Sequence, residues 1–229
     1  MIVEIREDAI ERGVTRVCHF TQGRSLMHII RDGNGIIATA KLRELQNAIL
    51  NPTDTNRYDG RLDCVCCSIQ YPNVYYLNIV QSRLSLFKDW VVLLVKPDYL
   101  WMEETAFCPM NASAGRGVYV SEGYSTYADL YSGQCTDSQG RTFVRSKSHL
   151  SACPTNIQAE VLIRGHIDEK DITGIVVRTQ SQAKRYSVQC KLAGLDNRFP
   201  LIVAPDFYDP QKLSRMIRTG ERPSEKVLE

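Results

Sequence analysis

The sequence predicts a single α+β domain built on a mixed β-sheet. Two helix patterns occur in the first fifty residues, strand patterns recur between residues 16 and 203, and no repeat, low-complexity tract or linker divides the 229 residues. Short helices early and strands throughout are typical of the α+β class. A chain of this length suits one domain with a hydrophobic core. We therefore expect one domain over residues 1–229.

The first fifty residues predict a strand followed by two helices. Residues 16–21 (RVCHFT) have the composition of a short strand. Ser25 is a suitable N-cap for a helix through the apolar residues that follow, and Gly33 and Gly35 are suitable residues to end it. Residues 41–50 place apolar side chains on one face and predict a second helix.

Later segments predict most of the sheet. We expect strands at residues 63–69, 90–96, 159–163, 174–178 and 200–203. The second of these, WVVLLVK, is apolar on both faces, which predicts a central position in the sheet. A helix over residues 181–192 is expected between the last two strands.

Two stretches lack a clear pattern. Residues 108–154 are rich in Gly, Ser, Thr and Tyr and have weak periodicity. Loops of this length in compact domains are usually functional or mobile, so we expect one of these two properties here. The segment after Asp209 is polar and predicts either a surface helix or a frayed tail.

Composition favours a cytoplasmic protein. The net charge is +2, so any contact with nucleic acid must come from local patches. Residues 1–16 are charged almost throughout and lack the apolar core of a signal peptide, and the apolar run 90–95 is too short to cross a bilayer. Eight cysteines without a secretion signal predict reduced thiols. We therefore expect a cytoplasmic protein without membrane association.

Three short motifs match functional patterns only loosely. Residues 33–38 fit GxGxxA, but they follow a helix pattern, which favours a helix end over a dinucleotide-binding turn. The CxxC within residues 64–67 has no second close pair, which favours buried strand residues over a zinc site. Residues 111–113 fit the glycosylation pattern, which a cytoplasmic protein does not use. We expect no bound metal.

Three separated segments carry side chains suited to a nucleotide. His19 ends the first predicted strand, and the turn into the next helix offers backbone N–H groups to a polar ligand. Arg57 offers a fork for a pyrophosphate, and Tyr71 and Tyr75 flank a Pro-Asn turn where they can stack on a flat nicotinamide ring. Glu160 begins an apolar strand directly after the long loop, where an unpaired charge needs a partner or a function.

Each segment also has a plain structural interpretation. A single histidine such as His19 is more often a core or capping residue. The stretch that begins with Arg57 fits a tyrosine-rich edge of the core with a surface arginine. A salt bridge would explain Glu160 in isolation.

Together the segments resemble the DarT toxins, which are DNA ADP-ribosyltransferases that use NAD. The resemblance runs from about residue 16 to residue 178, and its motifs in order are H-F-T at 19–21, R-x-D-G at 57–60, S-I-x-x-P-N at 68–73 and Q-A-E-V-L at 158–162. Residues 107–112 (F-C-P-x-N-A) are similar to the branch of the family whose target base is guanine.

The resemblance implies the ADP-ribosyltransferase fold, a split mixed β-sheet with flanking helices and a cleft that holds NAD as co-substrate. Glu160 would be the catalytic carboxylate, and Arg57 would clamp and polarise NAD. The expected NAD-binding residues are His19, Phe20, Thr21, Ser25, Leu26, Arg57, Tyr71, Asn73 and Tyr75. The loop before Glu160 would present the substrate.

The substrate side is expected to bind single-stranded DNA. The expected nucleic-acid-binding residues are Asn111, Arg141, Arg145, Lys147 and Gln158. Residues 140–149 and 178–186 interleave basic and aromatic side chains, which suits the phosphates and bases of a single strand. A solvated charged face explains the first cluster equally well.

Two departures from the family pattern bear on specificity. The family often has Asn where Ser25 stands, which leaves one NAD contact open. The aromatic D-Y-V-P-F-Y-F strand of thymine-modifying members is replaced by residues 63–69 (DCVCCSI), which argues against thymine. We therefore predict transfer of ADP-ribose to guanine.

The resemblance also implies a toxin of a toxin–antitoxin system, with an antitoxin of the macrodomain or NADAR type that has ADP-ribosyl hydrolase activity. The alternatives are an ADP-ribosyltransferase that acts on RNA or protein, and a non-catalytic module that binds NAD or nucleic acid. An assay of NAD consumption separates the enzymes from the binding module.

Overall fold

The computed structural model describes residues 2–44, 57–84, 88–196 and 198–228. The central sheet, in chain order, contains β1 (Val17–Gln22), β3 (Cys64–Ile69), β4 (Trp90–Val95), β5 (Ala106–Cys108), β6 (Ser121–Glu122), β9 (Glu160–Arg164), β11 (Ile172–Val177), β12 (Leu201–Val203) and β13 (Lys226–Val227). Their order across the sheet is β13-β12-β11-β4-β1-β3-β9-β5-β6. β11 and β12 are parallel and the other neighbours are antiparallel, so the predicted mixed sheet is confirmed.

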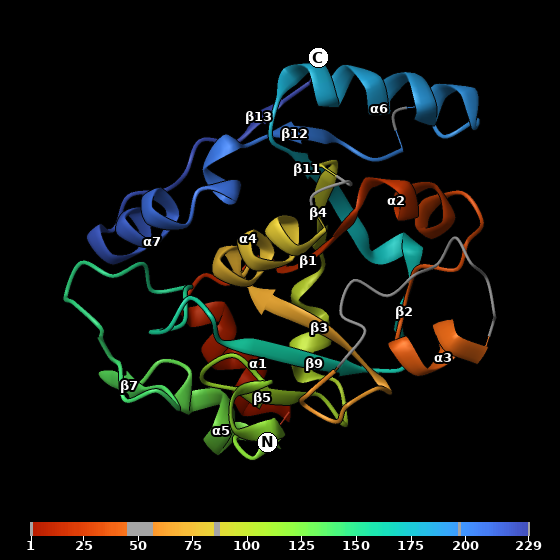
Figure 1. Ribbon diagram of the computed structural model, residues 1–229. Coiled ribbons are helices and arrows are strands. Elements are labelled where there is room, and N and C mark those ends of the chain that lie inside the picture. Colours follow the sequence, from red (N-terminus) through yellow and green to blue (C-terminus); the bar gives the residue numbers. More distant parts are fainter. Residues whose placement is uncertain (1, 45–56, 85–87, 197, 229) are drawn as a thin grey trace.

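Helices cover both faces of this sheet (Figure 1). They are α1 (Ile2–Glu11), α2 (Gly23–Ile30), α3 (Thr39–Glu44), α4 (Val74–Arg83), α5 (Tyr124–Asp129), α6 (Gln180–Leu192) and α7 (Pro210–Thr219). Apolar side chains of α1, α2, α5 and α6 share one core cluster, and those of α4 and α7 share a second. Alternate residues of β4 enter the two clusters, and all six are buried, which agrees with the predicted central strand.

The sheet opens between β1 and β3. These strands pair only at Val17 with Ile69 and at Cys18 with Ser68. Beyond that point β1 continues along β4 as far as Gln22, whereas β3 continues along β9. The divergence is the predicted split of the sheet into two halves.

The elements of the predicted sheet lie within about two residues of their expected positions, and several other elements differ. The helix that Ser25 was expected to cap begins at Gly23, with Gln22 as its N-cap, and Ser25 lies inside it. Of the helix predicted over 41–50, α3 accounts for the first residues, and residues 45–50 lie outside the described parts.

Residues 74–83 are the largest difference from the prediction. The predicted strand ends at Ile69 as expected, but the tyrosine-containing segment after the Pro-Asn turn, for which no helix was predicted, forms α4. Asn73 caps this helix, because its Oδ1 accepts the N–H of Tyr76 at 3.1 Å. Val74, Leu77 and Val80 recur every three residues and bury one face, so packing overrides the strand preference of the β-branched and aromatic residues.

The long loop and the polar tail both contain regular structure. Residues 108–154 include β6, α5 and a hairpin of β7 (Gln134–Thr136) and β8 (Thr142–Val144). A further pair joins β2 (Ile36–Ile37) to β10 (His166–Ile167). In the tail, the predicted alternative of a surface helix holds. α7 is capped by Asp209 and ends at Gly220, whose φ of 79° is left-handed.

No helix in the described part of the chain is long and apolar enough to cross a membrane.

Candidate functional site

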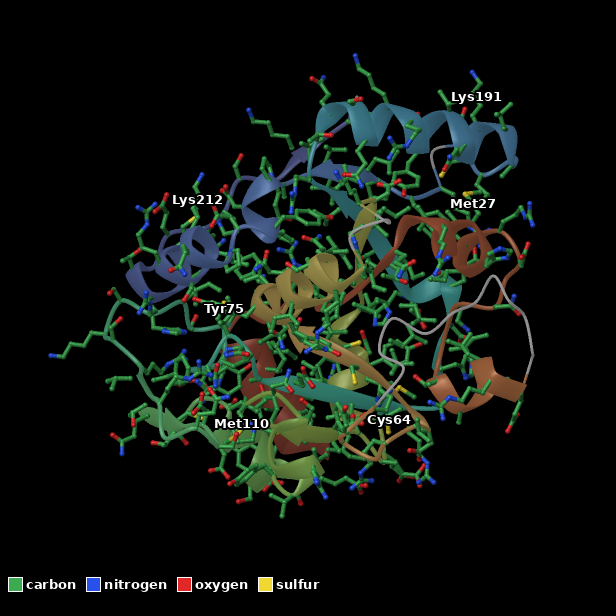
Figure 2. All side chains as sticks on the ribbon, in the orientation of Figure 1. Met27, Cys64, Tyr75, Met110, Lys191 and Lys212 are labelled. Carbon is green, nitrogen blue, oxygen red and sulfur yellow. The ribbon has the colours of Figure 1, made fainter. Side chains whose placement is uncertain are left out.

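The opening between β1 and β3 holds a cavity of about 140 Å³. Its lining comes from residues 18–21 of β1, from α2, from residues 34–37 around β2, and from residues 64–68 of β3. Cys64, labelled in Figure 2, belongs to this lining. Glu160, the first residue of β9, also lines the cavity. The split of the sheet therefore places a carboxylate in a pocket of mixed polarity.

Three N–H groups hold the carboxylate of Glu160. Its Oε1 accepts Nδ2 of Asn73 at 3.0 Å and Nδ2 of Asn111 at 3.1 Å. Its Oε2 accepts the backbone N–H of Ala112 at 3.1 Å. The side chain is only 7% exposed, so these bonds fix its orientation in the cavity wall.

The pKa of Glu160 is raised to about 7. Burial is the largest cause, because removing water disfavours the charged form. The hydrogen bonds from Ala112 and Asn73 and the charge of Arg57 lower the pKa, whereas the nearby carboxylate of Asp59 raises it. A carboxyl group with a pKa close to neutrality can act as a base in the physiological range.

The two asparagines that donate to Glu160, Asn73 and Asn111, are themselves fixed by further hydrogen bonds. Oδ1 of Asn73 caps α4 while its Nδ2 binds Glu160, so the helix start and the carboxylate are aligned by one side chain. Oδ1 of Asn111 accepts the N–H of Ser113 at 3.0 Å and also its hydroxyl. These contacts assign the amide orientation of each asparagine, since the carbonyl side must face a donor.

His19 presents one nitrogen to the cavity. Its Nδ1 lies 2.9 Å from the carbonyl oxygen of Cys66, which can only accept, so Nδ1 carries the proton. Burial lowers the pKa of His19 and the charge of Arg57 lowers it further, against the hydrogen bond to Cys66, so the neutral ring is favoured. Nε2 of His19 is therefore an acceptor for a ligand hydroxyl or amide.

Arg57 lies in the cavity wall with its guanidinium engaged by protein acceptors. Nε and Nη2 donate to the two carboxylate oxygens of Asp59 at 3.0 and 2.8 Å. Nη1 donates to Oγ1 of Thr39 at 3.3 Å and to the carbonyl of Cys64 at 2.8 Å, and Nη2 also donates to the carbonyl of Arg61. All five N–H groups thus have acceptors within the protein.

The backbone at Arg57 adopts an uncommon conformation. Its φ is 38°, which is in the left-handed region that residues with side chains rarely enter. The N–H of Gly60 donates to the Arg57 carbonyl at 3.0 Å and closes the R-x-D-G turn. Both Arg57 and Asp59 are 7% exposed, so a buried bidentate pair supports this conformation.

The structure brings most of the predicted NAD-binding residues to the cavity. Those that line it are His19, Phe20, Thr21, Ser25, Arg57 and Asn73. Leu26 does not, because it is fully buried in the core beneath α2. Tyr71 packs edge-on against Phe207 with ring centroids 5.4 Å apart, on the side of α7.

Tyr75 also lies outside the cavity lining, and Tyr76 is part of it. Tyr75 packs against the core that α4 and α7 share and is labelled on α4 in Figure 2. Successive residues of a helix point about 100° apart, so the helical conformation of this segment selects Tyr76 rather than Tyr75.

The predicted nucleic-acid-binding residues are scattered. Asn111 lines the cavity, whereas Gln158 does not. Arg141 is paired with Asp137 at 2.7 Å, and Lys147 is exposed. Arg145 is half-buried and donates to the carbonyls of residues 150, 151 and 153 and to Oγ1 of Thr155. These hydrogen bonds stabilise the loop that contains Arg145.

Several cavity residues were missed from the sequence. Asp59 and Ser68 lie within the R-x-D-G and S-I-x-x-P-N motifs, so their positions carried a signal. Residues 34–37 were interpreted as a helix end, and they reach the cavity because β2 pairs with β10. No local pattern predicts that pairing of two-residue strands.

Comparison with known proteins adds a family to this geometry. The profile of the family described as "ssDNA thymidine ADP-ribosyltransferase, DarT" matches residues 18–209. No curated protein matches the sequence.

Solved structures with a similar fold include Thermosipho africanus DarTG in complex with ADP-ribose, with a TM-score of 0.57 and 14% identity over 85% of this chain. The present chain spans about half (51%) of the length of that protein. Thermus sp. 2.9 DarT in complex with ADP-ribosylated ssDNA has a TM-score of 0.56 and 12% identity, and the match covers 86% of this chain and 97% of that one.

The same Thermus protein in complex with NAD+ has a TM-score of 0.54 and 13% identity, with 85% and 97% of the two chains covered. At these identities the neighbours establish the fold alone, and it is the expected ADP-ribosyltransferase fold. The match to the family extends over most of the sequence and includes His19, Arg57 and Glu160. The chain therefore belongs to the DarT family of single-stranded DNA ADP-ribosyltransferases.

Proposed function

We propose that this chain transfers ADP-ribose from NAD to a base of single-stranded DNA, with Glu160 as the catalytic carboxylate. The observation that carries the proposal is the buried Glu160, held by three N–H donors in the wall of a cavity that it shares with His19. Thermus sp. 2.9 DarT is described in complex with NAD+, with carba-NAD+ and with ADP-ribosylated ssDNA. These complexes support NAD as the co-substrate and a single strand as the acceptor.

Glu160 has two tasks in this reaction. Cleavage of the nicotinamide–ribose bond of NAD builds positive charge on the ribose, and the ionised carboxylate stabilises that charge. When a base nitrogen attacks the ribose, Glu160 accepts the proton that the nitrogen loses. Nicotinamide leaves as a neutral molecule and needs no general acid, so one carboxylate is sufficient.

The remaining cavity residues bind and orient NAD. His19 accepts a ribose hydroxyl or the carboxamide N–H at Nε2, with Thr21 and Ser25 as further polar contacts. Phe20 and Tyr76, whose ring centroids lie 6.0 Å apart, supply an aromatic wall. Tyr76 takes the stacking role that the sequence assigned to Tyr71 and Tyr75.

Arg57 acts through the residues that accept its hydrogen bonds rather than by contacting NAD. Because its N–H groups already have acceptors, a direct fork to the pyrophosphate would require exchange of Asp59 for a phosphate. We assign Arg57 a positioning role, in which it fixes the R-x-D-G turn and the start of β3 and places a positive charge beside Glu160. That charge favours the ionised form of Glu160.

The pH dependence of the rate tests the role of Glu160. The group must be ionised to act, and its pKa is about 7, so kcat/KM for NAD should rise about tenfold per pH unit below 7 and level off above it. Burial lowers the pKa of His19 below its ordinary value, so His19 is not the source of a rise in rate centred near pH 7. Initial rates between pH 5.5 and pH 8.5 measure the profile. A rate that is flat from pH 5.5 to pH 7 would contradict the assignment.

Guanine is the proposed acceptor. Residues 107–112, which resemble the guanine-modifying branch, lie at the catalytic carboxylate, because Cys108 pairs with Glu160 across the sheet and Asn111 binds it. The acceptor nitrogen must reach the same place. A single strand avoids most of the cost, a few kcal/mol, of unstacking a base from a duplex.

Oligonucleotides that each lack one base test the acceptor. We expect NAD-dependent mass adducts on every strand except the one without guanine, and weaker modification of duplexes. The family description names thymidine, so the result for the strand without guanine must be compared with the result for the strand without thymine. Modification that persists without guanine and stops without thymine would reverse the assignment. Parallel reactions with RNA and protein test the alternative acceptors.

Uncontrolled modification of DNA would be lethal to a cell, which supports a toxin that acts in the cytoplasm beside an antitoxin with ADP-ribosyl hydrolase activity, of the macrodomain or NADAR type. The neighbour from Thermosipho africanus is described as DarTG in complex with ADP-ribose, and the match covers only 51% of that longer chain. Removal of the adduct from modified DNA by such a hydrolase, measured by mass, tests this pairing.

A further inference from the structure

The C-terminal helix α7 carries a row of cations. Lys212, Arg215 and Arg218 follow one another at three-residue spacing, and all are exposed. Lys212, labelled in Figure 2 on the outer side of α7, is paired with Asp206 at 2.8 Å. Arg222 is exposed two residues after Gly220, where the helix ends.

The loop before Glu160 brings one more cation to this row. The hydroxyls of Ser146 and Ser148 donate to the carbonyl of Arg218 at 2.7 and 3.3 Å, so Lys147 is held against the end of α7. We call Lys147, Arg215, Arg218 and Arg222 the α7 surface. Within the described residues, none of these four cations lies within ion-pair distance of a carboxylate.

Structural roles do not account for the α7 surface. A cation in the last turn of a helix stabilises the negative end of its dipole, which explains Arg218. It does not explain the three further cations, for which the described residues offer no ion-pair partner. The charge also does not follow from overall composition, since the whole chain has a net charge of only +2.

The α7 surface lies near the catalytic carboxylate. Ile217 of α7 and Ala159, the residue before Glu160, line the same small apolar cavity of about 10 Å³. The N–H of Leu150 donates to the Ile217 carbonyl at 2.9 Å. In Figure 1 the blue helix α7 lies beside α4 and the segment that leads to β9.

The packing places α7 on the face of the sheet from which Glu160 is held. Leu213 and Ile217 of α7 share a core cluster with Val74 and Leu77 of α4. The cap of α4 is Asn73, which binds Glu160. The helix that carries the α7 surface is therefore connected to Glu160 through α4 and its cap.

We infer that the α7 surface binds the phosphates of the nucleotides that flank the modified base. This inference rests on the proposed function. Single strands carry one negative charge per nucleotide, and exposed unpaired arginines and lysine suit such a backbone without reading its sequence. Arg215, Arg218 and Arg222 lie outside residues 18–209, which the family profile matches, and Lys147 lies within them.

The test compares two triple variants that each remove three positive charges. The first is R215Q/R218Q/R222Q, on the α7 surface. The matched control is R6Q/K184Q/K191Q, which changes exposed cations on α1 and α6 that have no ion-pair partner among the described residues. Gln is a good helix former, so both variants should keep the fold, which thermal unfolding checks. Binding of labelled mixed-sequence oligonucleotides of 4 and 12 nucleotides is measured by anisotropy at several salt concentrations.

We expect the α7 variant to bind the 12-nucleotide strand on the order of 10-fold more weakly at low salt. The slope of log K against log salt should decrease in magnitude by about 2, at about 0.7 per lost phosphate contact. Binding of the 4-nucleotide strand and of NAD should not change, and the control variant should match the wild type.

Three results would overturn the inference: a wild-type salt slope in the α7 variant, an equal loss for both strand lengths, or an equal loss in the control. The first is expected if the surface instead binds an acidic protein. Failure of the proposed function has a different signature. In that case the wild type binds the oligonucleotides and forms no ADP-ribose adduct.

Discussion

Replacement of Glu160 by Gln is expected to lower the rate of ADP-ribose transfer by at least about 10³-fold. Gln keeps the size of the side chain but carries no charge to stabilise the ribose cation and cannot accept the proton of the base. Loss of one preorganised electrostatic partner typically costs 10²–10³-fold, and Glu160 supplies two functions. Its amide nitrogen would also face one of the three N–H donors that now hold the carboxylate.

Nicotinamide release and DNA adducts measure this loss, and Glu122→Gln is the matched control. Glu122 is exposed on β6 at the far edge of the same sheet and should leave the rate unchanged. Rates within tenfold of wild type in Glu160→Gln would end the assignment of this residue as the catalytic carboxylate.

A stability measurement shows whether Glu160→Gln acts through the charge. The folded pKa of about 7 lies above the ordinary value of 4.5, so between these values the folded state retains a proton that the unfolded state has released. The free energy of unfolding therefore falls as pH rises from about 4.5 to about 7, by up to about 3 kcal/mol. Urea unfolding at several pH values should show this slope in the wild type and its loss in the variant.

The sheet was largely predictable, because its central strands carry their pattern locally. Residues 90–96 are apolar on both faces and form β4. By contrast, residues 74–83 contain valines, an isoleucine and tyrosines, which favour strands, and they form α4. The deciding features are the Asn73 cap and the burial of one face against α7, which lies about 130 residues later in the chain. A contact that distant leaves no local pattern.

The motifs that form the candidate site could be predicted from the sequence, but the hydrogen bonds between their residues could not. His19, Arg57 and Glu160 come from separate segments, and the structure brings all three to one cavity. The partners that set their chemistry were not predictable, because they depend on tertiary contacts. Asn73 was assigned to NAD and Asn111 to nucleic acid, yet both bind Glu160. Arg145, assigned to nucleic acid, is occupied by carbonyls of its own loop.

The second large effect is expected for Arg57→Lys, with a fall in kcat of about 10²-fold or more. Lysine keeps the charge but offers three donors in place of five, and it cannot form the bidentate pair with Asp59. Acceptors on Thr39, Asp59 or Cys64 are left without a donor in a buried wall, so the R-x-D-G turn loses its position beside Glu160. Arg61→Lys, the same change four residues later, is the control and should be close to wild type.

Asp59→Asn distinguishes a positioning role for Arg57 from a direct clamp on NAD. If Arg57 acts through its network, Asp59→Asn should reproduce the loss of kcat, and the double variant should be little worse than either single variant. Glu160 should then also respond, because Arg57 lowers and Asp59 raises its pKa. Removal of the Asp59 charge in Asp59→Asn should therefore move the pH–rate midpoint down, whereas Arg57→Lys, which keeps the positive charge, should move it less. A clamp on NAD predicts a different split. In that case Arg57→Lys raises KM for NAD at nearly unchanged kcat, and Asp59→Asn, which frees the fork for a phosphate, leaves KM equal to or lower than that of the wild type.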